Sequence, residues 1–374
     1  MTPIHMAGPW VTELEERYVL DALRNGWYGD KAYWYVETLE RDFARFHGRK
    51  YALMTPNCTT AIHLLLAGLG IRAGDEVIAP ESTWIASVAA ITYVGATSVF
   101  ADVDPVHWCL TPATIEAAAS ARTKAVIAVD LFGNMPDMDA IAAWCAERKI
   151  ILIEDAAEAL GSTYKGRRAG GFGRASVFSF HRTKTMTTGE GGMLVLDDDD
   201  LFARCKLLRD HGRAPFSYHN VEVAYKYMPF NLQAALGYGQ FQRLTELVEK
   251  KRWIWEGYRR RLGDIPDLGL NPVQDDVFNS VWGHILLFGR SHRMDQERAI
   301  RELGALGVPS RPFFLPLSAL PAFPGRKEDG QKRHPVAYDI FSRAINLPGA
   351  LNLTDEHLDA ICNGVRRILG RDRI

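Results

Sequence analysis

The sequence lacks the features that would place it in a membrane or a secretory pathway. No stretch approaches the ~20 consecutive apolar residues of a membrane-spanning helix, and Met1–Trp10 has no apolar signal core. Cysteine is scarce and forms no Cys-x-x-Cys pair, so the thiols are expected to be reduced, as in a cytoplasmic protein. The five cysteines are Cys58, Cys109, Cys145, Cys205 and Cys362.

An excess of charge of either sign is also absent. With 44 Lys and Arg against 45 Asp and Glu, the formal net charge is −1, which leaves no basic footprint for a nucleic acid. Internal repeats and low-complexity tails are missing, and no metal site is predicted. The 374 residues, 47% hydrophobic and 24% charged, are enough to bury a large core, in two domains or in one large and one small domain.

Short apolar runs alternate with helical patterns up to about residue 200. This alternation predicts an α/β fold with a mainly parallel sheet and helices on both faces. The predicted strands are Tyr51–Met54, Val77–Ala79, Ser98–Ala101, Ala125–Val129, Ile150–Ile153, Ser176–Phe180 and Met193–Leu196.

The helices are predicted from capping residues and amphipathic periodicity. Thr111 can cap a helix over Pro112–Ser120, where proline suits the first turn, and Met138–Lys149 is a second helix. The long amphipathic stretch Asn231–Leu262 is predicted to be a helix that links two domains, followed by mixed α and β structure. Gly325–His334 is predicted to be a polar loop.

Lys184 lies in the run Phe178–Gly192, in which hydroxyls and glycines surround a single lysine between two apolar strands. An amine that forms an imine must be partly desolvated, and nearby amides and hydroxyls can hold an anion. From this run alone, a solvated loop lysine is an equally good interpretation.

Asp155 follows the apolar strand at Ile150–Ile153. Open α/β sheets place their ligand chemistry at the carboxyl ends of strands. Pyridoxal phosphate needs both a lysine for its aldehyde and a carboxylate for its pyridine nitrogen. The alternative for Asp155 is a cap on a helix over Ala156–Leu160.

Turn formers and hydroxyls in Thr55–Thr60 follow the strand at Tyr51–Met54 and begin an apolar helix. Free amides and threonine hydroxyls at a helix N-terminus form a potential phosphate site. Asn and Thr also cap ordinary helices, so this signal is weak by itself.

Taken together, these segments resemble the DegT-type sugar aminotransferases, a branch of the pyridoxal-phosphate enzymes of fold type I. The resemblance covers nearly the whole chain, from Gly26-Trp27 to Ile345–Pro348, and Glu158 and Arg311–Leu317 resemble the perosamine synthases and their near relatives. It implies an aspartate-aminotransferase-like fold with a mainly parallel seven-stranded sheet. Residues 1–245 would form the large cofactor-binding domain, and residues 246–374 a smaller α+β domain.

The resemblance implies the cofactor pyridoxal 5'-phosphate, with pyridoxamine 5'-phosphate as an intermediate. Lys184 would form the imine, an internal aldimine, and then move the proton. The other cofactor-binding residues would be Asp155 at the pyridinium, Trp84 on the ring, Glu158 near the phenolic oxygen, and Ser179, Thr59 and the Cys58 amide at the phosphate. Core packing for Trp84 and a helix-surface position for Glu158 are the alternatives.

The resemblance also implies partners and a reaction. Glutamate would give its amino group to a keto sugar, in a homodimer with shared active sites to which Lys226 of the partner subunit contributes. Arg311, Trp27 and His181 would bind substrate, although a surface ion pair is the alternative for Arg311. The favoured acceptor is a nucleotide-linked 4-keto-6-deoxyhexose.

The sequence departs from the family pattern at several positions. Cys58 replaces a glycine, Asp130 and Ser318 stand where many relatives have histidine, and Met228 cannot replace an arginine. An 8-keto octulosonate or a 3-keto hexose therefore remains an alternative acceptor, and a non-catalytic regulatory protein is an alternative from another class. A sugar 3-dehydratase is disfavoured, because those enzymes replace the imine lysine with histidine.

Overall fold

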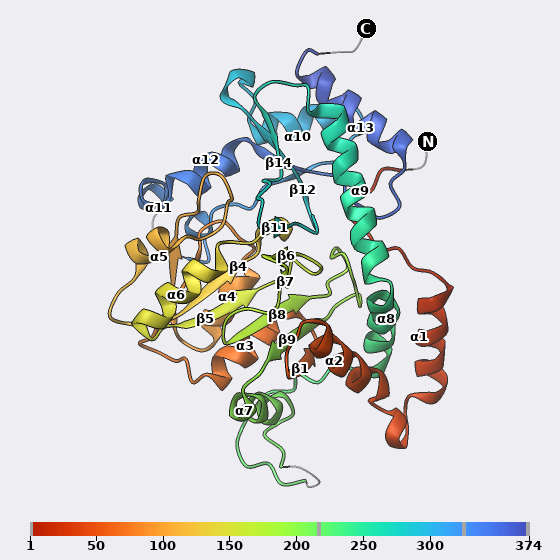
Figure 1. Cartoon of the computed structure of the whole chain (residues 1–374), viewed down its shortest axis with the longest axis vertical. Helices are drawn as coiled ribbons and strands as arrows, with labels where there is room; N and C mark the ends of the chain where they lie inside the picture. Colours follow the sequence, from red (N-terminus) through yellow and green to blue (C-terminus); the bar gives the residue numbers. More distant parts are fainter. Residues whose placement is uncertain (1–2, 215–217, 324–326, 372–374) are drawn as a thin grey trace.

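The computed structural model describes residues 3–214, 218–323 and 327–371, and its largest sheet has seven strands. Their order is β1-β9-β8-β5-β4-β2-β3, and only β9 among them runs antiparallel to its neighbours. This confirms the predicted seven-stranded, mainly parallel sheet (Figure 1). The bounds are β1 (Tyr51–Thr55), β2 (Glu76–Pro80), β3 (Thr97–Ala101), β4 (Thr123–Val129), β5 (Ile151–Asp155), β8 (Ala175–Ser179) and β9 (Gly192–Leu196).

Helices cover both faces of this sheet. Alternate strand residues point to opposite sides, and because the strands are mainly apolar, both faces have to be buried. One face packs on α3 (Cys58–Gly68), α4 (Ala86–Tyr93) and α7 (Asp199–Arg209). The other packs on α2 (Trp34–Phe46), α5 (Pro112–Ala118), α6 (Met138–Arg148) and α8 (Asn231–Gln242). Thr111 caps α5 as predicted, since its side chain accepts a hydrogen bond from the Thr114 amide.

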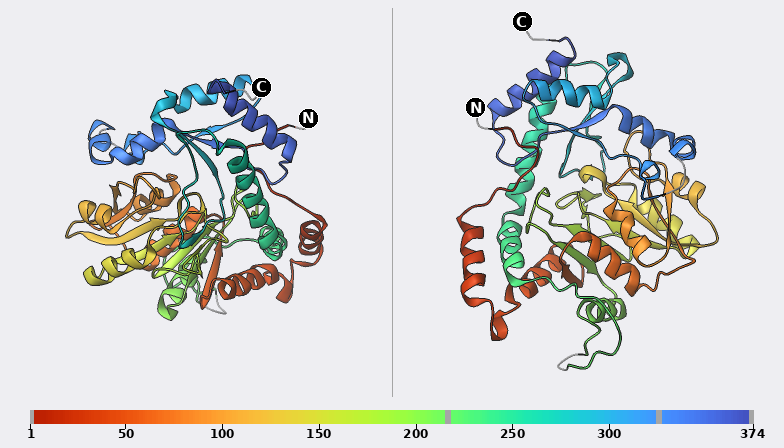
Figure 2. Two further views of the ribbon diagram at one scale, coloured as in Figure 1. Left: turned by 45° about the horizontal axis from the view of Figure 1, so that its top comes forward. Right: turned by 180° about the vertical axis from the view of Figure 1, so that it is seen from behind.

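The predicted single helix over Asn231–Leu262 is wrong, because two helices, α8 and α9 (Leu244–Leu262), meet at Arg243. The Arg243 backbone is not helical there (φ −103°, ψ 12°). Its guanidinium bonds to Glu15 at 2.8 Å and so ties the junction to α1 (Glu13–Asn25). Figure 2 shows α1 beside α8, while α9 continues toward the C-terminal part of the chain.

The C-terminal part contains an antiparallel sheet in the order β10-β12-β14-β13. Its strands are β10 (Leu268–Leu270), β12 (His284–Phe288), β13 (Arg311–Pro312) and β14 (Ala344–Leu347). The helices packed around it are α9, α10 (Gln296–Ala305), α12 (Pro335–Arg343) and α13 (Asp355–Ile368). The division at residue 245 stays a prediction.

The predicted loop at Gly325–His334 is helical over most of its length, as α11 (Lys327–Arg333). Acidic residues in its first turn and basic residues in its last turn complement the helix dipole, which explains why a polar stretch is helical. Gly325 and Arg326 lie outside the described residues.

A third sheet, of three strands, connects the two parts of the chain. In it β11 (Val277–Phe278) pairs with β6 (Thr163–Tyr164), which pairs with β7 (Arg167–Arg168). The Lys165 amide also donates to the Asp276 carbonyl at 2.7 Å. Residues after α9 are therefore hydrogen-bonded to the segment that follows β5.

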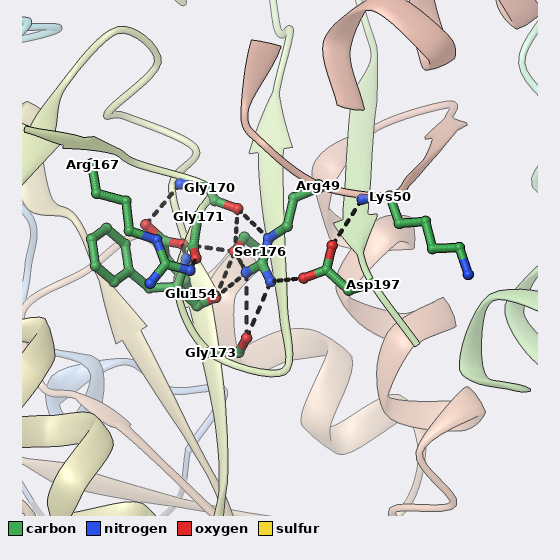
Figure 3. Close-up of polar contacts among 10 residues, drawn as sticks. Arg49, Lys50, Glu154, Arg167, Gly170, Gly171, Gly173, Ser176 and Asp197 are labelled. Carbon is green, nitrogen blue, oxygen red and sulfur yellow. Dashed lines mark hydrogen bonds and ion pairs between the residues drawn. The ribbon is translucent and has the colours of Figure 1, made fainter. Parts of the chain in front are cut away.

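A buried cluster around Arg49 fixes the end of that segment (Figure 3). Its guanidinium donates to the Gly170 carbonyl at 2.8 Å and to Asp197 at 2.7 Å. Glu154 accepts from the Gly170 amide at 2.8 Å and from Ser176 Oγ at 2.7 Å. Because Glu154 and Asp155 are successive strand residues, these bonds hold Glu154 on one face and leave Asp155 on the other.

Within the described residues, no helix has both the length and the apolar character needed to cross a membrane.

Candidate active site

One cavity of about 1620 Å³ lies between the large sheet and the C-terminal part of the chain. Most of the predicted site residues line it, although they come from distant parts of the sequence. They are Cys58, Thr59, Trp84, Asp155, Glu158, Ser179, His181, Lys184 and Arg311.

Asp155 is the last residue of β5 and is only 3% exposed. Its Oδ2 accepts a hydrogen bond from Ser87 Oγ at 2.7 Å, and its Oδ1 accepts one from the Ala157 amide at 3.1 Å. Burial raises the pKa of this carboxyl, and the Ser87 bond opposes that change. No helix follows β5 at Ala156–Leu160, so the helix-capping interpretation is wrong.

Lys184 lies in the turn after β8, and its side chain is 13% exposed. Its Nζ is 3.2 Å from Oε1 of Glu158 and 3.8 Å from the ring centroid of Trp282. The interpretation as a solvated loop lysine is therefore wrong, since the amine is largely removed from water and held on two sides.

Glu158 is 6% exposed and not on a helix surface, which corrects that alternative. Its Oε2 accepts a hydrogen bond from the Phe132 amide at 2.9 Å. Burial raises the pKa of the Glu158 carboxyl, while the neighbouring Lys184 favours the ionised form. The side chain is fixed beside the lysine.

The first turn of α3 faces the cavity. Asn57 caps it by accepting a hydrogen bond from the Thr60 amide at 2.9 Å, and the Cys58 and Thr59 amides, as the first of the helix, have no intrahelical acceptor. Burial raises the pKa of the Cys58 thiol well above its usual value, so the neutral thiol leaves the amide as the polar group. Gly192 permits this arrangement, because a Cβ there would lie 2.5 Å from the Cys58 nitrogen.

Ser179 ends β8 and lines the same region of the cavity. Its Oγ accepts a hydrogen bond from the His181 amide at 3.3 Å. A hydroxyl and the free amides of a helix N-terminus form an anion site of the kind that binds phosphate.

Trp84, His181 and Arg311 line the remaining wall. Trp84 is 60% exposed, with its ring 6.1 Å from that of Phe314, so the core-packing alternative is wrong. Burial lowers the pKa of His181, whose Nδ1 lies 2.9 Å from Thr183 Oγ1. Arg311 is exposed on β13.

Two predicted site residues do not line the cavity of their own chain, as far as the described residues define it. Lys226 pairs with Asp210 at 2.6 Å. Trp27 is 57% exposed and donates from Nε1 to the Leu23 carbonyl at 2.6 Å. Their roles stay predictions.

Three residues that line the cavity are not predicted from the sequence: Ser87, Trp282 and Lys251. Ser87 interrupts an otherwise apolar helix soon after Trp84, and that hydroxyl was the one available signal. Trp282 and Lys251 come from the C-terminal part, where no motif marks them.

The residues present fit pyridoxal phosphate. A buried carboxylate with fixed orientation, a desolvated lysine and a helix N-terminus meet in one cavity, as a protonated ring nitrogen, an aldehyde and a phosphate require. Fold and site together define a pyridoxal-phosphate-dependent aminotransferase.

Comparison with known proteins gives the family. Residues 9–366 match the DegT/DnrJ/EryC1/StrS aminotransferase family. The chain is 36% identical over 359 residues to a GDP-perosamine synthase of Escherichia coli O157:H7, covering 96% of each. It is 36% identical over 368 residues to the GDP-perosamine synthase of Caulobacter vibrioides, covering 98% of each.

A solved structure agrees with these matches. A protein from Streptococcus pneumoniae assigned as a sugar aminotransferase, in its PLP form, superposes with a TM-score of 0.90 at 28% identity over 99% of each chain. The chain belongs to the DegT/DnrJ/EryC1/StrS aminotransferase family. It is a pyridoxal-phosphate-dependent enzyme of the sugar aminotransferase class.

Proposed function

We propose that this enzyme transfers an amino group from glutamate to the 4-keto carbon of a nucleotide-linked 6-deoxyhexose. The observation that carries the proposal is the convergence of Asp155, Lys184 and the first turn of α3 on one cavity. The names of the two GDP-perosamine synthases support a nucleotide-linked sugar.

When bound, pyridoxal phosphate supplies an aldehyde that holds the amino group and a ring that accepts the electrons released with the donor's α-proton. Asp155 would hold the protonated ring nitrogen, and the cation would offset the cost of burying the carboxylate. Thr59, Ser179 and the Cys58 amide would bind the phosphate, and Trp84 would cover the ring face.

Lys184 would hold the cofactor's carbonyl carbon in the resting enzyme and, once released, move the α-proton. Glu158 supports both tasks, because it accepts a hydrogen bond from Nζ at 3.2 Å and fixes where the amine lies. The same residues would work in reverse when the keto sugar receives the amino group, so ping-pong kinetics is expected.

The wall that binds substrate is rich in arginine. Arg182, Arg301 and Arg311 line the cavity, and Arg311 is proposed to bind the glutamate carboxylate or a substrate phosphate. The cavity of about 1620 Å³ would have to hold the cofactor as well as the acceptor. Because it exceeds the ~300–1,000 Å³ of ordinary ligand pockets, it has room for an acceptor larger than a free sugar.

The proposal includes a homodimer in which Lys226 reaches the partner subunit's cofactor phosphate, because in its own chain this lysine pairs with Asp210 and does not line the cavity. A cytoplasmic location is proposed as well. All five cysteines are buried in the described part of the chain and none is joined in a disulfide, which supports a reducing compartment.

The test is a panel of keto sugars offered with glutamate, read out as 2-oxoglutarate formed. Turnover with a nucleotide-linked 4-keto-6-deoxyhexose, and none with the same hexose lacking its nucleotide, is expected. Turnover only with an 8-keto octulosonate or a 3-keto hexose would replace the proposed acceptor. Absence of 2-oxoglutarate with every acceptor would refute the proposal that glutamate is the amino donor.

A further inference from the structure

Trp282 covers the amine of Lys184. It is half-buried and lies two residues before β12, in the C-terminal part of the chain. The Lys184 Nζ is 3.8 Å from its ring centroid, and its Nε1 donates to the Thr183 carbonyl at 2.9 Å. The tryptophan thus touches both the lysine and the backbone that presents it.

Two strained turns hold the Trp282 ring in place. Val281 is buried at φ 54°, and Phe132 has φ 55°. Positive φ is unusual for residues with a side chain, and especially for a β-branched one, and such strain concentrates at functional sites. The turns meet at Gly133, where a Cβ would lie 2.9 Å from the Val281 nitrogen. The Phe132 and Trp282 rings are nearly parallel, at 8° and 5.8 Å between centroids.

Lys251 is hydrogen-bonded to the backbone of Trp282. Its Nζ donates to the carbonyls of Trp282 at 3.2 Å and Gly349 at 2.6 Å, and the residue is 2% exposed. Burial lowers the pKa of Lys251 to about 7, and a neutral amine still has the two donors that these two carbonyls need. In either protonation state, Lys251 can therefore hold the Trp282 backbone in place by hydrogen bonds.

We infer that Trp282 is a positioning residue that keeps the free amine of Lys184 beside Glu158 during amino-group transfer, with Lys251 fixing the tryptophan. A cation over an aromatic ring is favoured by an amount that corresponds to about a 3- to 30-fold preference. The ring matters most when Lys184 is released and has to move a proton. This inference rests on the proposed role of Lys184.

The first experiment separates the ring from its hydrogen bond. Trp282→Leu removes both, whereas Trp282→Phe keeps an aromatic face without the donor to Thr183. With Trp282→Leu, we expect kcat to fall about 3- to 30-fold, KM for glutamate to stay within about twofold, and the α-deuterium isotope effect on kcat to rise. Trp282→Phe should recover most of kcat. Unchanged kinetics in Trp282→Leu, or equal losses in both variants, would overturn the inference.

Trp253→Leu is the matched control. Trp253 holds the Nζ of Lys250 3.6 Å from its ring centroid, so the control removes a similar lysine–tryptophan contact between two residues that do not themselves line the cavity. We expect wild-type kinetics from it. A loss equal to that of Trp282→Leu would mean that the effect is not specific to the active site.

A second experiment tests the contact without measuring enzyme activity. Reductive methylation of the full-length protein before cofactor is added, followed by peptide mass spectrometry, measures the reactivity of Lys184. Trp282→Leu should accelerate its modification about 3- to 30-fold, and Lys251→Met should accelerate it to a smaller extent, whereas Lys250→Met should not. Equal rates in wild type and Trp282→Leu would overturn the inference. If the wild type shows protection but no glutamate turnover, the proposed donor fails and the role of Trp282 stands.

Discussion

Ser87 Oγ donates a 2.7 Å hydrogen bond to Oδ2 of Asp155, and so joins α4 to the end of β5. The bond is buried, and it orients the carboxylate that is proposed to hold the cofactor ring. The Ser87 Oγ is also 3.1 Å from Thr83 Oγ1, next to Trp84. A single hydroxyl therefore connects two of the proposed cofactor contacts.

Replacing Ser87 with alanine should weaken retention of pyridoxal phosphate. A buried carboxylate oxygen that loses its donor costs about 1–3 kcal/mol, which corresponds to roughly a 5- to 150-fold increase in the dissociation constant. Titration of the cofactor into the apoprotein, followed by its visible absorption, measures this constant. Ser98→Ala is the control, because that hydroxyl only reaches the Val88 carbonyl at 3.5 Å. Wild-type affinity in Ser87→Ala would contradict the importance of the bond.

Replacing Lys184 with alanine should abolish both the cofactor's visible absorption band and turnover. Removing a group that moves a proton costs about 10²–10⁴-fold in rate, and here the covalent attachment is lost as well. Absorbance spectra and 2-oxoglutarate formation check this, with Lys165→Ala, a surface pair with Asp139, as control. Full absorbance and turnover in Lys184→Ala would remove the basis of the assignment.

Mixing two inactive variants tests whether the active sites are shared. If Lys226 acts in the partner subunit, a heterodimer of Lys184→Ala and Lys226→Met chains has one site that carries both changes and one that carries neither. Activity should therefore reappear when the two proteins are unfolded, mixed and refolded. Mixtures that stay inactive, despite mass-spectrometric detection of heterodimers, would place Lys226 in its own chain's site or outside any site.

Of two arginines on α10, one lines the cavity, and it is expected to bind the phosphates of the nucleotide-linked substrate. Arg301 lines the cavity, whereas Arg298 pairs with Glu302 at 2.7 Å and does not line it. A charge-assisted hydrogen bond to a phosphate contributes about 1.5–3 kcal/mol, so Arg301→Gln should raise KM for the keto sugar roughly 10- to 100-fold. The KM for glutamate should be unchanged, and Arg298→Gln should resemble the wild type. Equal effects of both variants would indicate a general loss of charge.

The buried amine of Lys251 predicts a pH dependence of stability. Burial lowers its pKa to about 7 from an ordinary value of 10.5, so between these two values the unfolded chain binds more protons. The contribution of Lys251 to the free energy of unfolding should therefore rise from pH 7 to pH 9, by at most about 1.4 kcal/mol per pH unit. Buried thiols such as Cys109, whose pKa is raised by burial, have the opposite effect on stability once the unfolded thiols ionise near pH ~8.5. The contribution of Lys251 is therefore measured as a difference between proteins that share these thiols.

Urea unfolding at pH 7, 8 and 9 measures this slope as the difference between wild type and Lys251→Met. The variant should lack the increase, because the buried titrating group is gone. Lys206→Met, which changes an exposed lysine on α7, should keep it. A parallel pH dependence in wild type and Lys251→Met would contradict the prediction.

The strands of the large sheet could be predicted to within two residues, because each is a short apolar run between turn residues. Cap chemistry is equally local, and Thr111 was identified for that reason. That Asp155 would lie in a cavity could be predicted because it ends a parallel strand, and Lys184 could be placed there from the hydroxyls and glycines around it.

Features that depend on distant packing could not be predicted. The break at Arg243 depends on Glu15, which is far away in the sequence. Trp282 approaches Lys184 because two turns with positive φ meet at Gly133, and no local pattern encodes that meeting. Nothing in the local sequence distinguishes Ser87 from other small residues of a buried helix, because its partner Asp155 is far away in the chain.

The pairing of β11 with β6 has a mechanical consequence. Backbone hydrogen bonds between β11 and β6, together with a 2.9 Å contact between Ser162 Oγ and Ser280 Oγ, connect the C-terminal part to the segment that follows β5. These bonds lie close in sequence to Trp282. A wide hinge motion would have to break these bonds at every turnover. The cavity is therefore expected to keep its width while ligands enter and leave. For protein engineering, this means that acceptor preference is tunable through side chains on the rim without redesigning a closure movement.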